Sequence, residues 1–312
     1  MNDPQSLARP IRSTATPDKD PARPLPLAWE TYSDKALSDW YSLLSTEPEE
    51  EEVQRFLELH PSMIPGGSGD IGPGGHHGSD MGAVFRRPRL IGSGRMFEPD
   101  FMWITRSSGL VTPILIEIEK PLKRWFKKDG RPTSDFTEAR DQLNDWRSWF
   151  AREGNQASFR ETFLFLNDKY KNRPLEPQYV LIYGRESEFD PGHGHAYPDE
   201  LRYKRDQQRA RDETFMTFDS LRPRYDHRNS MTLTMTSYGP KIHAFSPMYG
   251  TSSFVGEGAL ILDDPLPALS RSVMMPDERR AYLAKRWDYW KEEERKNNAD
   301  PNGMHFRQSG IE

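Results

Sequence analysis

The chain has 312 residues and a formal net charge of -5, with 43 Lys and Arg against 48 Asp and Glu. It contains no cysteine, which excludes a disulfide framework and a thiolate metal site. No apolar stretch approaches the ~20 residues of a membrane helix, and the first residues lack the apolar core of a signal peptide. We expect a large cytoplasmic protein in which any nucleic-acid binding depends on local basic clusters, because the overall charge is negative.

The chain is expected to begin with an arm followed by two helices. Residues 1–28 are rich in proline and charge, which predicts a disordered arm. In residues 28–45, tryptophan, tyrosine and leucine recur at roughly helical spacing, which predicts a helix packed on the core. A second helix is expected between Pro48 and Pro61, because acids fill its first turn and its apolar residues share one face.

A glycine-rich segment follows at residues 65–82, "PGGSGDIGPGGHHGSDMG", and predicts a flexible loop. His76 and His77 in this loop, with His193 and His195 further along, raise the question of a zinc site. Adjacent histidines in a glycine loop lack the fixed spacing of zinc motifs. We therefore expect loops that contact DNA or become ordered on binding, and no zinc site.

Two apolar segments, "FEPDFMWI" and "TPILIEIEK", carry three acids and are separated by a Ser/Gly turn that predicts an antiparallel hairpin. The hairpin would bring Asp100 beside Glu117. With a strand period of two, Glu117 and Glu119 point to one face, with Cα atoms roughly 6.6 Å apart, and Lys120 points to the other.

These acids predict a metal site. A strand this apolar is normally buried, and burying unpaired carboxylates would cost several kcal/mol or force one to take up a proton. A cation relieves that cost, and oxygen ligands of this kind suit magnesium or manganese. The alternative is an edge hairpin whose acids face water.

Basic residues flank the proposed site on both sides. Trp125 and Phe126 interrupt the second group, so a surface that contacts phosphates and packs on a sugar or base is expected. A solvated loop is the alternative. The first group comprises Arg86, Arg87, Arg89 and Arg95, and the second comprises Lys120, Lys123, Arg124, Lys127, Lys128 and Arg131.

Further elements are expected downstream. Thr133 or Ser134 would cap a helix that ends at Gly154, and "FLFLND" and "QYVLIYG" are apolar runs that include a core strand. Another strand is expected in "ETFMTFDSL". Beyond about residue 227 the composition changes, and "SMTLTMTSY" is expected to add an edge strand.

The terminal segment, "PDERRAYLAKRWDYWKEEERKNN", predicts a charged helix with Leu283, Trp287 and Trp290 on one stripe. These tryptophans would pack either within the chain or against a partner.

The combination of "PDF" and "EIEK" resembles the PD-(D/E)xK nuclease signature, and its surroundings are similar to the Shedu family of bacterial anti-phage nucleases. Four more segments fit this resemblance: "EEVQRFLELHPSMI", "EARDQLNDWRSWF", "QYVLIYGRESEF" and "ETFMTFDSLRPRY". It covers about residues 49–226. The family pattern usually ends Glu-x-Lys, whereas here Glu119 follows Glu117 and the lysine stands at position 120, so the chain resembles a Glu-x-Glu variant.

The resemblance implies an α/β fold with a restriction-endonuclease-like core, in which helices flank a mixed sheet. It implies a nuclease domain at residues 29–226, including the preceding helix, and a C-terminal extension at 227–312 for which a role in oligomerisation is an expectation. It also implies cleavage of DNA in defence against bacteriophage, and a homo-oligomer, most simply a tetramer.

The resemblance also implies roles for individual residues. Asp100, Glu117 and Glu119 would bind Mg²⁺ or Mn²⁺, with Glu119 as a further ligand or general base. The other residues assigned to the catalytic site are Lys120, Glu52 (with Glu51 as the alternative) and Gln142. Residues assigned to DNA binding are Lys123, Arg124, Lys127, Lys128, Arg86, Arg87 and Arg185, although Arg185 would alternatively pair with a nearby acid.

Two other functions are compatible with the sequence. Because the lysine is displaced, the chain could be a catalytically weakened nuclease fold that binds DNA or acts as a scaffold. It could also be a metal-dependent hydrolase of a small phosphorylated substrate.

Overall fold

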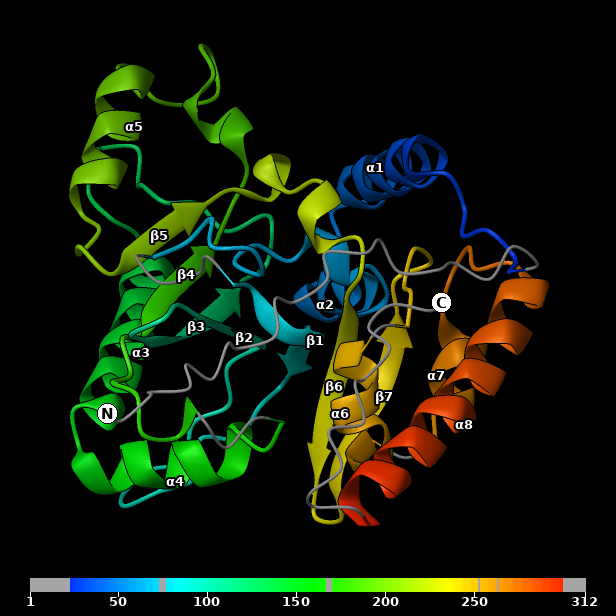
Figure 1. The fold of residues 1–312 in the computed structure, drawn as a ribbon. Helices are drawn as coiled ribbons and strands as arrows, with labels where there is room; N and C mark the ends of the chain where they lie inside the picture. The colour runs from blue at the N-terminus through cyan, green and yellow to red at the C-terminus, as the bar shows by residue number, and fades with distance from the viewer. Residues whose placement is uncertain (1–22, 73–76, 167–169, 252, 263, 300–312) are drawn as a thin grey trace, which may run out of the picture.

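The computed structural model describes residues 23–72, 77–166, 170–251, 253–262 and 264–299. In these residues seven strands form one mixed sheet in the order β5-β4-β3-β2-β1-β6-β7 (Figure 1). β1 to β3 and the pair β6–β7 are antiparallel, whereas β3–β4, β4–β5 and β1–β6 are parallel. The strands are β1 (Ser79–Arg86), β2 (Phe101–Arg106), β3 (Val111–Ile118), β4 (Gln178–Ile182), β5 (Glu213–Met216), β6 (Met231–Thr236) and β7 (Gly239–Phe245).

Helices cover both faces of this sheet, so the expected α/β architecture is confirmed. One face packs against α1 (Trp29–Ser45) and α2 (Glu50–Leu59), and the other packs against the remaining large helices. None of the described helices is both long and apolar enough to cross a bilayer. The other helices are α3 (Ser134–Phe150), α4 (Glu153–Phe163), α5 (Pro198–Gln207), α6 (Ser253–Leu262), α7 (Leu266–Arg271) and α8 (Asp277–Ala299).

The central hairpin, β2–β3, has the alternation that the sequence predicted. All eight residues of β3 are buried. Leu115 belongs to the core on the α3 side, whereas Ile116 and Ile118 belong to the core under α1 and α2. Glu117 therefore faces the α3 side, where its carboxylate meets a side chain from that helix.

β1 begins inside the glycine-rich segment that the sequence predicted to be entirely a loop, and this is a correction. Met81 and Gly82 both have positive φ, +57° and +66°, and the pairing of β1 with β2 is irregular between Ser79 and Val84. A Cβ on Gly82 would lie 2.0 Å from the carbonyl oxygen of Asn229, so only glycine fits there. His76 lies outside the described residues.

The helix expected between Thr133 and Gly154 is shorter than predicted. Thr133 caps α3, because its hydroxyl accepts a hydrogen bond from the amide of Phe136 at 3.2 Å. α3 ends at Phe150, and Gly154 lies in the first turn of α4, a helix that the sequence did not reveal. "QYVLIYG" supplies β4, whereas "FLFLND" contains the end of α4 and no described strand.

The C-terminal part of the chain joins the same sheet. β6 lies between β1 and β7 and is not the edge strand that was expected. Leu283, Trp287 and Trp290 of α8 are each at most 2 % exposed and lie in the α3-side core, so these tryptophans pack within the chain. Of the arm expected at residues 1–28, only 23–28 are described, and the carbonyl of Pro24 accepts a hydrogen bond from Arg279.

His60 gives the fold a predictable response to acid. It is 5 % exposed, its ring stacks on Phe56, and its Nδ1 is hydrogen-bonded to the hydroxyl of Tyr32 at 3.2 Å. Burial lowers the pKa of His60 to about 4. In the unfolded chain this histidine binds a proton near pH 6.5, whereas in the folded chain it does so only near pH 4. Stability from this group is therefore present above pH 6.5 and is lost as the pH falls towards 4, by about 3 kcal/mol in total.

We expect His60→Gln to flatten the decline of unfolding free energy between pH 6.5 and 4, measured by urea denaturation. His193→Gln, which changes an exposed histidine, is the control and should follow the wild type. Parallel curves for wild type and His60→Gln would show that His60 is charged inside the fold.

Candidate functional site

The site lies at the end of the central hairpin where β2 begins and β3 ends. Phe101 pairs with Ile116, so Asp100 stands opposite Glu117, as the hairpin predicted. Oδ2 of Asp100 accepts a hydrogen bond from the amide of Ile118 at 2.9 Å. This bond fixes the carboxylate against the neighbouring strand.

Glu117 is held from the opposite side by α3. Its Oε1 accepts a hydrogen bond from Nε2 of Gln142 at 2.7 Å, so Gln142 contacts the site as the sequence comparison implied. Glu117 is only 9 % exposed, and its Oε2 is buried with no hydrogen-bond partner in the described part of the chain. A buried carboxylate oxygen without a donor costs free energy unless a cation or a proton binds it.

The electrostatics of the acids agree with this geometry. Burial, followed by repulsion from Glu50 and Glu119, raises the pKa of Asp100 to about 8. Burial also raises the pKa of Glu117 well above its usual range, with Asp100 as the strongest charged neighbour. Asp100, Glu117, Glu119 and Glu50 thus form one interacting group, which we call the acidic cluster.

The helix acid in this cluster is Glu50, and the expectation for Glu52 and Glu51 is corrected. Oε2 of Glu52 accepts a hydrogen bond from the amide of Glu49, which closes a capping box at the start of α2. Glu51 pairs with Arg55 at the surface. Burial and the charge of Glu119 raise the pKa of Glu50. Helical spacing in the sequence indicates Glu50, because this residue precedes the buried Val53 and Leu57 by three and seven residues and so shares their face of the helix.

Two lysines near the cluster have separate partners. Lys120 forms an ion pair with Glu49, so its ammonium lies on the α2 side and not beside Glu117. Nζ of Lys123 contacts Oε2 of Glu119 at 2.5 Å. Lys123, which the sequence analysis assigned to DNA binding, therefore also contacts the acidic cluster.

In the present arrangement of their side chains, the acids of the cluster provide only part of the ligands that a divalent cation needs. Among the described side chains, no three acids or histidines converge closely enough to hold a metal ion. Glu119 is turned towards Lys123, and this removes the third carboxylate. Magnesium keeps several waters and takes one or two protein carboxylates, so the pair Asp100 and Glu117, with its unpartnered oxygen, suits it.

Two arginines assigned to DNA binding, Arg86 and Arg185, pair with acids of the fold, and for Arg185 this is the acid pairing that the sequence offered as the alternative. Nε of Arg86 lies 2.6 Å from the buried carboxylate of Glu58, and this arginine also reaches Thr234. Arg185 forms three hydrogen bonds to the carboxylate of Asp219 and a fourth to the carbonyl of Leu44. These contacts leave both guanidinium groups committed to the fold.

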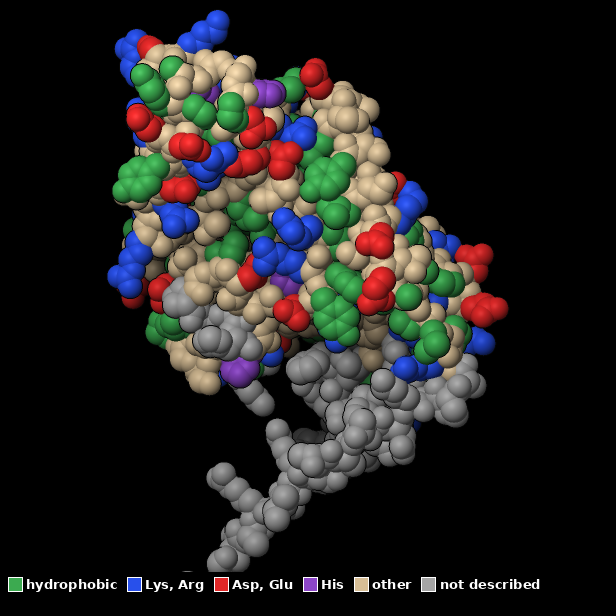
Figure 2. All heavy atoms as spheres, turned by 90° about the horizontal axis from the view of Figure 1, so that it is seen from above, with side chains coloured by type: hydrophobic (Ala, Val, Ile, Leu, Met, Phe, Trp, Pro, Cys, Tyr) green, Lys and Arg blue, Asp and Glu red, His purple; other side chains and the backbone are tan. Residues whose placement is uncertain are grey.

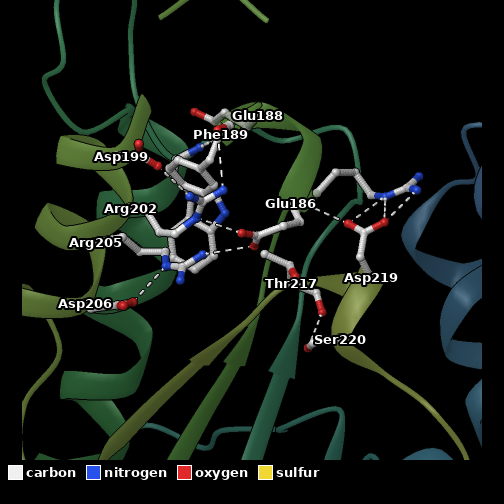
Figure 3. A network of polar contacts seen from close by, with 12 residues as sticks. Glu186, Glu188, Phe189, Asp199, Arg202, Arg205, Asp206, Thr217, Asp219 and Ser220 are labelled. Carbon is white, nitrogen blue, oxygen red and sulfur yellow. Dashed lines mark hydrogen bonds and ion pairs between the residues drawn. The ribbon is translucent and has the colours of Figure 1, made fainter. Parts of the chain in front are cut away.

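Asp219 is the centre of a wider network at this end of the sheet (Figure 3). It also accepts the amide of Glu186 at 2.6 Å, and the carboxylate of Glu186 binds Arg202 and Arg205 of α5. The network ties the loop after β4 to the 3-10 turn after β5 and to α5. It positions this end of the sheet.

The remaining basic residues differ in availability. Arg87 pairs with Glu98, and Arg124 donates to the carbonyl of His193 and contacts His195. Lys127 and Lys128 are exposed at a turn. Figure 2, which views the molecule from above Figure 1, shows Lys and Arg side chains mixed with Asp and Glu, without one continuous basic surface.

The two aromatic residues between Arg124 and Lys127 are not available for stacking on a ligand. Trp125 and Phe126 are at most 1 % exposed and belong to the α3-side core, which corrects the expected stacking surface. Glu188 accepts both of their backbone amides, at 2.8 and 3.0 Å. No local pattern indicated Glu188, because 62 or more positions separate it from its partners.

The fold and site together define an α/β protein with an acidic cluster around the buried Glu117 at the end of a central hairpin. The family model described as Shedu protein SduA, C-terminal, matches residues 47–222, which is more than half of the chain. The chain therefore belongs to the Shedu family, as the sequence motifs indicated. Comparisons with curated proteins and with solved structures found no match.

Proposed function

We propose that this protein is a metal-dependent DNA endonuclease that acts in defence against bacteriophage. Membership in the Shedu family supports the defence role. The observation that carries the nuclease proposal is the pair Asp100 and Glu117, in which Glu117 is buried and its Oε2 has no hydrogen-bond partner among the described residues. Such a pair suits a hard divalent cation, and phosphodiester hydrolysis commonly uses one.

Each residue of the site has a distinct task in this proposal. A bound magnesium ion would supply Lewis-acid chemistry, because it lowers the pKa of water and offsets negative charge on a phosphate. Asp100 and Glu117 would hold it, while the amide of Ile118 and the side chain of Gln142 keep the two carboxylates in place. Glu119 would serve as a further ligand or as a general base.

The substrate side of the proposal depends on few charges. The segment that carries Lys123 continues into the turn with Lys127 and Lys128, and five residues span at most about 18 Å. A phosphate backbone that reached the acidic cluster would therefore pass close to these lysines. Their contacts would be independent of base sequence, because they address phosphates.

A cleavage assay tests the proposal. Purified protein is incubated with supercoiled plasmid and with linear duplex DNA, in magnesium and in EDTA. We expect nicked or linear products that require magnesium. Binding without cleavage in either buffer would identify a DNA-binding scaffold. Absence of both, together with release of phosphate from a small phosphate ester, would identify a hydrolase of small substrates.

We expect the double variant Lys127→Met and Lys128→Met to weaken DNA binding without regard to sequence. Each lost phosphate contact lowers the slope of log affinity against log salt by about 0.9 on duplex DNA, so the double variant should lose up to about 1.8. The slope is measured by fluorescence anisotropy at roughly 50 to 300 mM salt, a range in which salt competes with contacts between lysines and phosphates.

The control is the double variant Lys241→Met and Lys285→Met, which removes two exposed charges from β7 and α8. Its slope should equal that of the wild type. An unchanged slope in the Lys127 and Lys128 variant would mean that the turn is a solvated loop.

A further inference from the structure

The contact between Glu119 and Lys123 places a cation inside the acidic cluster. The Lys123 side chain is 30 % exposed and that of Glu119 is 12 % exposed, so the pair is partly shielded from solvent. Four carboxylates interact here, and the ammonium of Lys123 lies beside one of them. It offsets part of their mutual repulsion in the absence of a metal ion.

The backbone around this contact is fixed, while the lysine side chain is not. The amide of Glu119 donates to the carbonyl of Ile182 at 3.0 Å, and the amide of Lys123 closes a turn on the carbonyl of Lys120 at 3.0 Å. The amide of Trp125 is held by Glu188. The ammonium stands on four rotatable carbons, so it can leave Glu119 without any change in the backbone.

We propose that Lys123 is a built-in counter-ion of the acidic cluster, which a divalent cation must displace from Glu119 to gain its third carboxylate. The absence of three converging ligands among the described residues follows from this arrangement, because Glu119 is engaged by the lysine. The inference rests on the proposed function only in taking the acidic cluster as a metal site. It makes Lys123 a positioning residue that acts through Glu119.

Displacement has a consequence for affinity and for the substrate. Breaking the ion pair costs free energy that the metal must supply, so Lys123 weakens metal binding. The released ammonium then lies next to the cluster without its hydrogen bond to Glu119, and a phosphate group would bind it there. Metal and DNA would thus favour each other, because each accepts one half of the broken pair.

The test measures Mn²⁺ binding to the full chain by isothermal titration calorimetry, without DNA. We expect Lys123→Met to bind Mn²⁺ roughly threefold to tenfold more tightly than the wild type, which is the range for loss of a partly shielded ion pair. Lys123→Arg keeps the charge and should retain wild-type affinity, and it also guards against misfolding of the methionine variant. Lys35→Met is the matched control, because Lys35 forms an i,i+4 pair with Asp39 on α1, away from the acidic cluster, and should leave the affinity unchanged.

A double variant locates the effect. In a Glu119→Gln background, adding Lys123→Met should no longer tighten binding, because the contact that the metal displaces is already gone. Equal affinities for wild type and Lys123→Met, or an equal gain in Lys35→Met, would overturn the proposal, as would failure of every variant to bind Mn²⁺. A protein that binds Mn²⁺ as expected but leaves DNA intact would refute the nuclease function and keep this inference.

Discussion

Replacing Glu117 with glutamine should abolish magnesium-dependent DNA cleavage. Glutamine keeps the shape of the side chain but removes the charge that would bind the cation, and Oε2 of Glu117 is the unpartnered oxygen of the site. Changes in residues that merely support metal ligands cost 10- to 100-fold. Loss of a ligand itself should therefore lower the cleavage rate by more than about a hundredfold. Plasmid nicking under single-turnover conditions measures this rate.

The fold should survive this substitution. Burial and repulsion from Asp100 raise the pKa of Glu117, so a neutral amide suits this position in the metal-free protein, and the variant should unfold at the same temperature as the wild type or above it. Glu98→Gln is the matched control, since Glu98 is an acid beside the same hairpin whose partners are Arg87 and Arg89. Wild-type cleavage by Glu117→Gln would remove the metal site from the proposal.

Replacing Arg86 with methionine should strongly destabilise the protein, because it leaves the buried carboxylate of Glu58 without its main cation. Glu58 is 5 % exposed. Burial acts to raise its pKa, but hydrogen bonds from His243 and Arg86 outweigh this and lower it, so it is ionised at neutral pH. Removing one partner of a buried pair costs about 3–5 kcal/mol. That is a large part of the total stability of about 5–15 kcal/mol.

Denaturation in guanidinium chloride measures this loss, and two further variants interpret it. Arg87→Met removes an exposed pair with Glu98 and should cost less than about 1 kcal/mol. Adding Glu58→Leu to Arg86→Met should restore much of the stability, because the uncompensated charge is gone. An Arg86→Met protein of wild-type stability that binds DNA less tightly would return Arg86 to the substrate surface.

The sequence by itself determined the elements with a strong local period. The acidic strand alternates as predicted, with Glu117 on the α3 side and Ile116 and Ile118 on the other, because strand parity is a property of the backbone. The same local reasoning located α1, α2 and the cap at Thr133. It failed for β1, whose bulge uses glycine for a close approach to Asn229 that no local pattern records.

Only the tertiary structure decided which charges belong to the site. Lys120 meets Glu49 across 71 positions of sequence, and Arg185 meets Asp219 across 34, so neither partner was visible in a local window. Lys123 is a local exception, four residues from Glu119, yet its place in the acidic cluster depends on the turn between them. Propensity and periodicity act over one or two turns of chain. Ion pairs depend on where the packed elements bring their ends, and so the sequence located the acids whereas the fold selected their partners.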